Sequence, residues 1–197
     1  MSLLEPSPFA SWADLEREAL ACTKCPLAET RTQVVFGVGD PHADLLFVGE
    51  GPGEQEDLTG EPFVGRAGRL LTSLIEDIGL TRAQVYIANV VKCRPPGNRD
   101  PLPLEIESCR PYLEAQIGFI EPKVVVTLGN FASKLLLQTK EGITKLRGRE
   151  FPFRDGAVLI PAFHPSAVLR NGGAALAQAR ADFVTIKRAL GRTSVPT

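Results

Sequence analysis

The chain has 197 residues, of which 44% are hydrophobic, enough for one well-buried core and short for two. Its formal net charge is −1, so the overall charge gives no general attraction for nucleic acid. No stretch approaches about 18 uninterrupted apolar residues, and the start has neither a cationic segment nor a long apolar run. These features argue against a membrane or secreted protein. They predict one soluble, cytoplasmic domain over 1–197, with frayed ends at 1–11 and 191–197.

The first half of the chain predicts two helices and two strands. A helix is expected over roughly 12–21, and the apolar run 44–48 predicts a strand. Leucines and isoleucines at helical spacing over 70–78 predict a helix that stops at Gly79, a residue that commonly follows a helix end. The β-branched run 85–91 predicts the second strand.

The second half continues this alternation. Its expected elements are a helix over 105–120, a strand over 123–128, a helix over 130–137, a strand over 157–162 and a last helix over 174–190. Pro111 lacks a backbone donor and is expected to kink the first of these helices.

Alternating strands and helices predict an α/β fold with right-handed crossovers. Because the four strands are continuously apolar, they are expected to form a central, mostly parallel, four-stranded sheet with helices on both faces. Ligands bind such sheets beyond the carboxyl ends of the strands. The unusual residues follow the strands there: a glycine-rich segment at 49–53, Asn89, Gly129-Asn130 and Phe163-His-Pro-Ser166.

The four cysteines have an informative spacing. Cys22 and Cys25 form a C-x2-C pair followed by proline, whereas fifteen residues separate Cys93 from Cys109. The second pair is not a zinc knuckle, and C-x2-C-P also occurs in ferredoxin-type ligation. In a reducing compartment, metal ligation or buried thiols are more natural than disulfides. The spacing alone leaves an iron–sulfur cluster, a zinc site and buried thiols open.

The segment 49–57 contains glycines but does not predict a phosphate site. It lacks the Lys and Ser/Thr of a P-loop, and its four carboxylates would repel phosphate. A carboxylate-rich loop after a strand suits water activation or cation stabilisation, although an acidic surface turn would have the same composition. Taken singly, His164 and Phe63 are as compatible with structural roles as with functional ones.

Taken together, these residues resemble one family, the iron–sulfur uracil-DNA glycosylases of bacteria and archaea called family 4. The resemblance rests on GEGPG at 49–53, PFVGRAG at 62–68, YIANVVKCRPP at 86–96 and FHPS at 163–166, together with the four cysteines. It covers roughly 20–190. It implies a three-layer α/β/α sandwich, in agreement with the sheet expected from the strand pattern.

The resemblance also implies the roles of individual residues. Cys22, Cys25, Cys93 and Cys109 would hold a [4Fe–4S] cluster. The uracil site would consist of Gly49, Glu50, Gly51, Pro52, Phe63, Asn89 and His164. Within it, Phe63 would stack on the flipped base, Asn89 would read its edge and His164 would face O2. A related branch traps DNA through a histidine in an inserted loop, but 92–99 contains no histidine.

Glu50 and His164 are the expected catalytic residues. Breaking the glycosidic bond places negative charge on uracil O2 and positive charge on the sugar, and His164 would donate to O2. Glu50 would either orient water or stabilise the cation, and the sequence leaves both roles open. No lysine occupies a motif position in the expected pocket, so the product should be an intact strand with an abasic site.

The expected partner is uracil-containing DNA, double- or single-stranded, bound by a monomer. Candidate phosphate contacts lie in loops at the strand ends, although solvated charges would look the same. They are Lys92, Arg94 and Arg99, then Lys145, Arg147 and Arg149, then Arg170. Val168 or Leu169 is the candidate wedge that fills the vacated stack.

Two other functions compete with this interpretation. A non-catalytic iron–sulfur protein that binds nucleic acid or transfers electrons would explain the cysteines but give Asn89 and His164 no role. A zinc hydrolase is disfavoured because the chain has only two histidines, His42 and His164.

Overall fold

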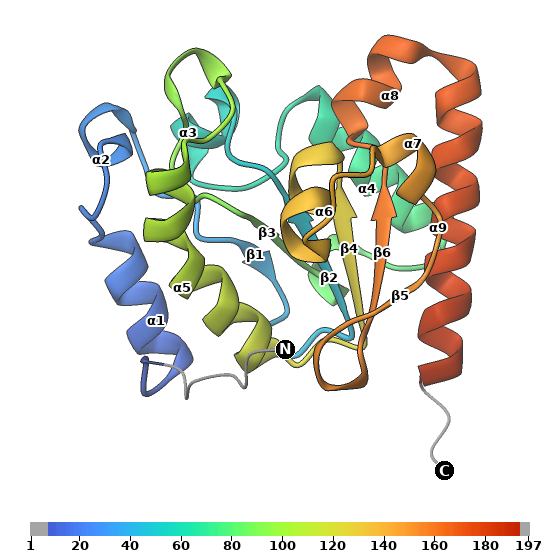
Figure 1. Cartoon of the computed structure of the whole chain (residues 1–197), viewed down its shortest axis with the longest axis horizontal. Coiled ribbons are helices and arrows are strands. Elements are labelled where there is room, and N and C mark those ends of the chain that lie inside the picture. The colour runs from blue at the N-terminus through green and yellow to red at the C-terminus, as the bar shows by residue number, and fades with distance from the viewer. Residues whose placement is uncertain (1–7, 194–197) are drawn as a thin grey trace.

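A computed structural model describes residues 8–193 and contains a six-stranded mixed sheet between two layers of helices (Figure 1). The strand order is β1-β3-β2-β4-β6-β5. The bounds of the strands are β1 Val38–Gly39, β2 Leu45–Gly49, β3 Tyr86–Asn89, β4 Val124–Leu128, β5 Phe151–Pro152 and β6 Val158–Ala162. The inner four, β3, β2, β4 and β6, are parallel. The predicted α/β/α sandwich is confirmed.

The sheet has six strands, not the four expected, because a short strand lies at each edge. β1 pairs with β3 and β5 pairs with β6, both antiparallel and both over two residues. Such short strands leave too little sequence for a periodic pattern to register. The second predicted strand is also shorter than expected. Val90 and Val91 have left the ladder, and their N–H groups donate to the carbonyls of Gly49 and Glu50.

Helices cover both faces of the sheet. The helices are α1 Trp12–Leu20, α2 Leu27–Thr30, α3 Glu54–Thr59, α4 Arg66–Asp77, α5 Pro103–Ile120, α6 Asn130–Leu137, α7 Ile143–Leu146, α8 Pro165–Asn171 and α9 Gly173–Thr193. Three-residue 3-10 turns lie at Arg82–Gln84, Pro96–Asn98 and Arg154–Gly156. The long predicted helices are confirmed, and α5 runs unbroken through Pro111.

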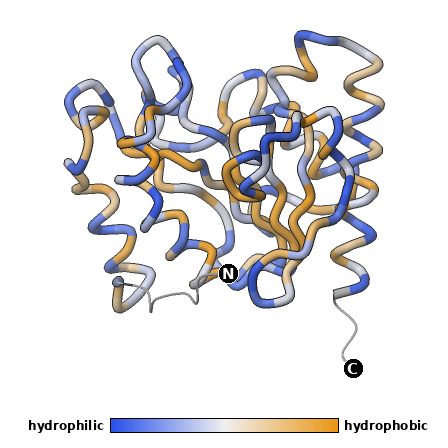
Figure 2. The backbone as a smooth tube through the Cα atoms, viewed as in Figure 1, coloured by the Kyte–Doolittle hydropathy of each residue, from blue (hydrophilic) through white to orange (hydrophobic). Residues whose placement is uncertain are grey.

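Two apolar clusters fill the space between the layers. In one, α4, α8 and α9 pack on side chains such as Phe47 and Val126, and in the other, α5 and α6 pack on alternate residues such as Leu46 and Val125. α1 packs on the outside of α5. Figure 2 shows hydrophobic residues concentrated along the central strands. Strands buried on both faces account for the continuous apolar runs.

The terminal segments are more ordered than expected where the structure describes them. Phe9 is buried and stacks on Tyr112, and the Ser11 hydroxyl caps α1 by accepting from the Asp14 N–H over 3.1 Å. At the other end, α9 continues through 191–193. The expectation for 1–7 and 194–197 lies outside the described residues. Within residues 8–193 no helix is both long and apolar enough to span a bilayer.

Candidate active site

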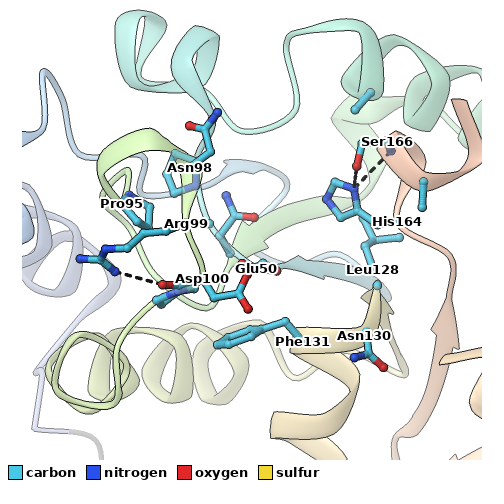
Figure 3. A pocket seen from close by; sticks show the side chains of 18 of the residues that line it. Glu50, Pro95, Asn98, Arg99, Asp100, Leu128, Asn130, Phe131, His164 and Ser166 are labelled. Atoms are coloured by element: carbon cyan, nitrogen blue, oxygen red, sulfur yellow. Dashed lines mark hydrogen bonds between the residues drawn. The ribbon is translucent and has the colours of Figure 1, made fainter. Parts of the chain in front are cut away.

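A cavity of about 1050 Å³ lies at the carboxyl ends of the four parallel strands (Figure 3). Each strand contributes the residues at or just beyond its end. These are Glu50, Gly51, Pro52 and Gly53 from β2, Asn89 from β3, Leu128 to Phe131 from β4, and Phe163 and His164 from β6. The predicted uracil site is therefore assembled in one place from segments far apart in the sequence. This is the ligand position expected for a parallel sheet.

Gly49 is the last residue of β2 and lies against Asn89 and Phe63, the residues predicted to read and to stack on the base. A Cβ at this position would overlap Oδ1 of Asn89 and would stand 2.7 Å from Cζ of Phe63. The absence of a side chain lets both residues lie directly over the end of the strand. Gly51 is similarly confined, because a Cβ there would stand 2.7 Å from Cγ2 of Val91.

Asn89 presents a buried acceptor without a protein partner. The residue is 2% exposed, and its Oδ1 has no hydrogen-bond donor among the described residues. An unsatisfied buried polar group costs about 1–3 kcal/mol, so it calls for an explanation such as a ligand donor. Asn89 lines the cavity, where a ligand can supply that donor.

Phe63 is held in a strained backbone conformation. Its φ is 54°, and the residue is only 7% exposed although it lines the cavity. The Glu56 carboxylate accepts from the N–H groups of Val64 and Gly65 over 3.0 and 3.2 Å, and from Gly53 over 3.1 Å. Glu56 therefore ties the glycine-rich segment to the loop that carries Phe63. The sequence identified Glu56 only as one of several carboxylates, since its partners at 64–65 are set by folding.

His164 is a half-buried imidazole that lines the cavity. Its Nδ1 accepts from the Ser166 N–H over 3.2 Å and lies 2.7 Å from the Ser166 hydroxyl. Burial lowers the pKa of His164 to about 4, with Arg170 acting in the same direction and Glu56 opposing them. A neutral ring whose Nδ1 accepts carries its proton on Nε2. The ring lies 5.6 Å from that of Phe63, centroid to centroid.

Glu50 lies across the cavity from His164, with Asp100 and Phe131 close to it (Figure 3). Burial, and then the charge of Asp100, raises the pKa of Glu50. Asp100 therefore adds a second carboxylate to this wall. The sequence did not indicate this residue, because its loop enters the cavity only through the tertiary fold.

The four cysteines are free thiols close enough to one another to interact electrostatically. Cys22 and Cys25 precede α2, Cys93 follows β3 and Cys109 lies on α5. Cys93 Sγ accepts from Arg31 Nη1 over 3.3 Å, and Cys109 Sγ accepts from the Lys92 N–H over 3.5 Å. Burial is the main cause that raises the pKa of Cys109 to about 11, and Cys93 and Cys25 add to it.

These surroundings suit cysteine thiolates that bind a metal or a cluster. N–H groups directed at sulfur are the second-shell contacts that metal-bound thiolates receive. Among residues 8–193 no three His, Cys, Asp or Glu side chains converge closely enough for one metal ion.

One predicted DNA contact is wrong. Lys92 is 2% exposed, and its Nζ donates to the carbonyl of Asn89 over 2.9 Å and to Oε1 of Gln116 over 2.5 Å. A phosphate outside the protein cannot reach this ammonium. The long apolar part of a lysine side chain can extend into the interior when an acceptor lies there. Here that acceptor is Gln116 on α5, which the residues around Lys92 in the sequence do not reveal.

Of the other predicted DNA contacts, Arg99, Arg147 and Arg94 have partners within the protein, whereas Arg170 lines the cavity. Arg99 forms two hydrogen bonds with the buried Glu105 carboxylate, and Arg147 pairs with Asp182. Arg94 is bonded to Asn98, while Arg170 lines the cavity at the end of α8. Lys134 on α6 also lines the cavity and was not predicted.

The two wedge candidates are separated by burial. Val168 is 3% exposed and packs in the core, whereas Leu169 is 43% exposed. Only Leu169 is available to a ligand.

Comparison with known proteins agrees with the motifs and the site. A family model described as the uracil DNA glycosylase superfamily matches residues 36–190. The chain is 53% identical to a type-4 uracil-DNA glycosylase of Thermotoga maritima over 151 residues, which cover 76% of this chain and 79% of that one. It is 47% identical to a type-4 enzyme of Sulfurisphaera tokodaii over 165 residues, covering 80% and 75%. A type-5 enzyme of Pyrobaculum aerophilum is 28% identical over 174 residues, covering 84% and 69%. The chain therefore belongs to the uracil DNA glycosylase superfamily.

Proposed function

We propose that this protein flips uracil out of DNA and hydrolyses its N-glycosidic bond, leaving free uracil and an abasic site. The unpartnered Oδ1 of Asn89, buried in the wall of the cavity, carries the proposal. Uracil offers an N3–H donor to this oxygen and an O4 acceptor to the amide NH2. Cytosine presents the reverse pattern and would leave the oxygen facing another acceptor.

The base is held between this edge contact and an aromatic face. Phe63 lies beside Asn89 above Gly49, and a flipped base stacks on such a ring while its Watson–Crick edge is read. The strained backbone at Phe63 is held by Glu56, so the stacking surface exists before DNA binds.

His164 supplies a neutral donor at O2. Its Nε2–H stabilises the negative charge that develops on uracil as the bond breaks, and one such donor is worth roughly 2.7–4 kcal/mol. The hydrogen bonds from Ser166 fix the tautomer and the ring orientation. A neutral imidazole needs no proton transfer to act in this way.

Glu50 supplies negative charge on the opposite wall. The positive charge that develops on the deoxyribose is stabilised by a carboxylate there, and the same group is placed to orient the attacking water. Its neighbour Asp100 increases the negative potential on this side of the cavity.

The same proposal assigns a [4Fe–4S] cluster to Cys22, Cys25, Cys93 and Cys109. When bound, the cluster supplies iron–thiolate bonds that cross-link the chain. The thiols of Cys93 and Cys109 are buried, and a metal deprotonates a coordinating thiol outright. Cys93 and Cys109 belong to the loop after β3 and to α5, so their ligation would hold the strand that ends in Asn89 against that helix.

The test is excision from an oligonucleotide that carries one radiolabelled uracil. The expected products are free labelled uracil and an uncut strand that breaks only on alkaline treatment. Release of no uracil would leave the non-catalytic iron–sulfur protein as the better account. Borohydride trapping of a protein–DNA adduct would contradict hydrolysis without a Schiff base.

A further inference from the structure

Arg147 and Asp182 form a buried ion pair behind the cavity wall that carries His164. Arg147 Nε lies 3.0 Å from Asp182 Oδ2, and its Nη2 lies 2.7 Å from Oδ1 and 2.6 Å from the carbonyl of Gln178. The side chains are 18% and 2% exposed. Figure 1 shows α7, which Arg147 follows, next to the upper end of β6 on the side of α9. Nε and Nη2 of this guanidinium are thus engaged within the protein.

The same guanidinium covers the ring of Phe163. Arg147 Cζ lies 5.0 Å from the ring centroid, within the range of a cation–π contact. Phe163 precedes His164, and both line the cavity. The adjacent backbone is tied to the same strand, because the Gly148 N–H donates to the carbonyl of Pro161 in β6 over 2.9 Å.

Asp182 fits this turn closely. Gly148 has a φ of 67°, and a Cβ there would stand 2.5 Å from Asp182 Oδ1. The carboxylate occupies the space that any other residue at 148 would need. The turn, the ion pair and the Phe163 ring therefore form one packed unit.

We propose that Arg147 is a positioning residue: paired with Asp182, it holds the Phe163 ring and thereby fixes the imidazole of His164 for its contact with uracil O2. This inference rests on the proposed function. Lysine cannot replace arginine in this role, because a single ammonium neither pairs with both carboxylate oxygens nor lies flat on a ring. A phosphate contact, in contrast, needs only the charge.

That difference gives the first experiment, single-turnover excision and DNA affinity as a function of salt. Arg147→Lys, Arg147→Gln and Asp182→Asn should each slow excision at least about tenfold, since small misplacements of a catalytic group are costly. The salt dependence of DNA affinity should not change. Arg180→Gln is the matched control, because Arg180 pairs with Asp77 on the exposed side of α9 and should leave both quantities unchanged.

A phosphate contact would give the opposite pattern. Arg147→Lys would then excise at the wild-type rate, and Arg147→Gln would reduce the slope of log affinity against log salt by about one. That result overturns the proposal.

A double variant tests whether Arg147 acts through His164. In a His164→Ala background, adding Arg147→Gln should cost no further rate, because the group being positioned is gone. A residue that only maintains the fold would lower the rate of the folded enzyme by the same factor in both backgrounds. An equal loss in both therefore counts against the proposal.

The last readout is independent of excision. The chain has two histidines, so His42→Gln leaves His164 as the only imidazole in an NMR titration. The pKa of His164 is lowered mainly by burial, and the charged groups that face it are Arg170 and Glu56. Arg147→Lys keeps the charge but loosens Phe163, so the titration midpoint should rise toward the ordinary value. An unchanged midpoint would refute the inference, whereas wild-type protein that releases no uracil would refute the proposed function.

Discussion

Gly49 and Asn89 lie so close together that a Cβ on the glycine would overlap the amide oxygen of the asparagine. The same Cβ would stand 2.7 Å from the Phe63 ring. The end of β2 therefore sets the positions of both the residue proposed to read the base and the residue proposed to stack on it.

Gly49→Ala should reduce uracil excision by about 10² or more, because the methyl group displaces Asn89 and Phe63. Overpacking of this kind costs roughly 1–3 kcal/mol, so the thermal midpoint should fall by several degrees while the protein still folds. Gly118→Ala is the control. Nothing lies within 4 Å of a Cβ at this position in α5, so it should raise stability and preserve the rate. Equal excision rates for Gly49→Ala and wild type would show that excision does not require the close contact of Gly49 with Asn89 and Phe63.

His164 should make folding stability depend on pH. Its pKa is lowered to about 4 from the ordinary 6.5, so between these values the unfolded chain binds more protons than the folded one. The contribution is fully present above pH 6.5 and is lost as the pH falls toward 4. Thermal midpoints measured from pH 7 to pH 4 should therefore fall less in His164→Gln than in wild type. Parallel curves for the two proteins would show that folding does not lower the pKa of His164.

Cys109→Ser should lose iron and stability together. Wild-type protein should contain iron and labile sulfide and absorb broadly near roughly 400 nm. The variant should lose most of this absorbance and unfold at lower temperature, yet its remaining folded fraction should excise uracil, because Cys109 does not line the cavity. Arg110→Gln, at the neighbouring exposed position, should retain the cluster. Stoichiometric zinc without iron in the wild type would contradict the assignment.

Arg170 should be a phosphate contact and Lys92 should not. Arg170→Gln is expected to weaken DNA binding and to reduce the salt slope by about one. Lys92→Met should destabilise the protein, because Gln116 and the Asn89 carbonyl lose their donor, but leave the slope unchanged. A reduced slope for folded Lys92→Met would mean that this ammonium reaches DNA.

The sequence predicted those parts of the fold that have a local cause. The inner strands were recognisable because burial on both faces gives continuous apolar runs. Glu50, Asn89 and His164 were noticed because each lies at or near a strand end, whereas Phe63, which lies between α3 and α4, was assigned only through the resemblance. The edge strands β1 and β5 were missed, since each consists of two residues that pair with distant chain.

The sequence failed mainly to predict which groups the charged side chains contact. Lys92 and Arg147 were predicted to face DNA, yet their acceptors on α5 and α9 draw them inward. Glu56 and Asp100 gain their positions in the site in the same way, through contacts between loops that only the folded chain brings together. The position of a charged residue beside a motif predicts that it lies near the site. Which group its side chain contacts depends on tertiary packing.

The exchange Asn89→Asp tests the central claim most directly, with excision measured under single turnover on oligonucleotides that carry one uracil or one target cytosine. The change is nearly isosteric, so the thermal midpoint should barely move. It replaces the NH2 donor to uracil O4 with an acceptor, and a bidentate base contact is worth roughly 1–3 kcal/mol of discrimination. Uracil release should therefore fall by at least about tenfold, and slow release of cytosine should appear. Uracil release at the wild-type rate by folded Asn89→Asp would show that Asn89 does not read the base.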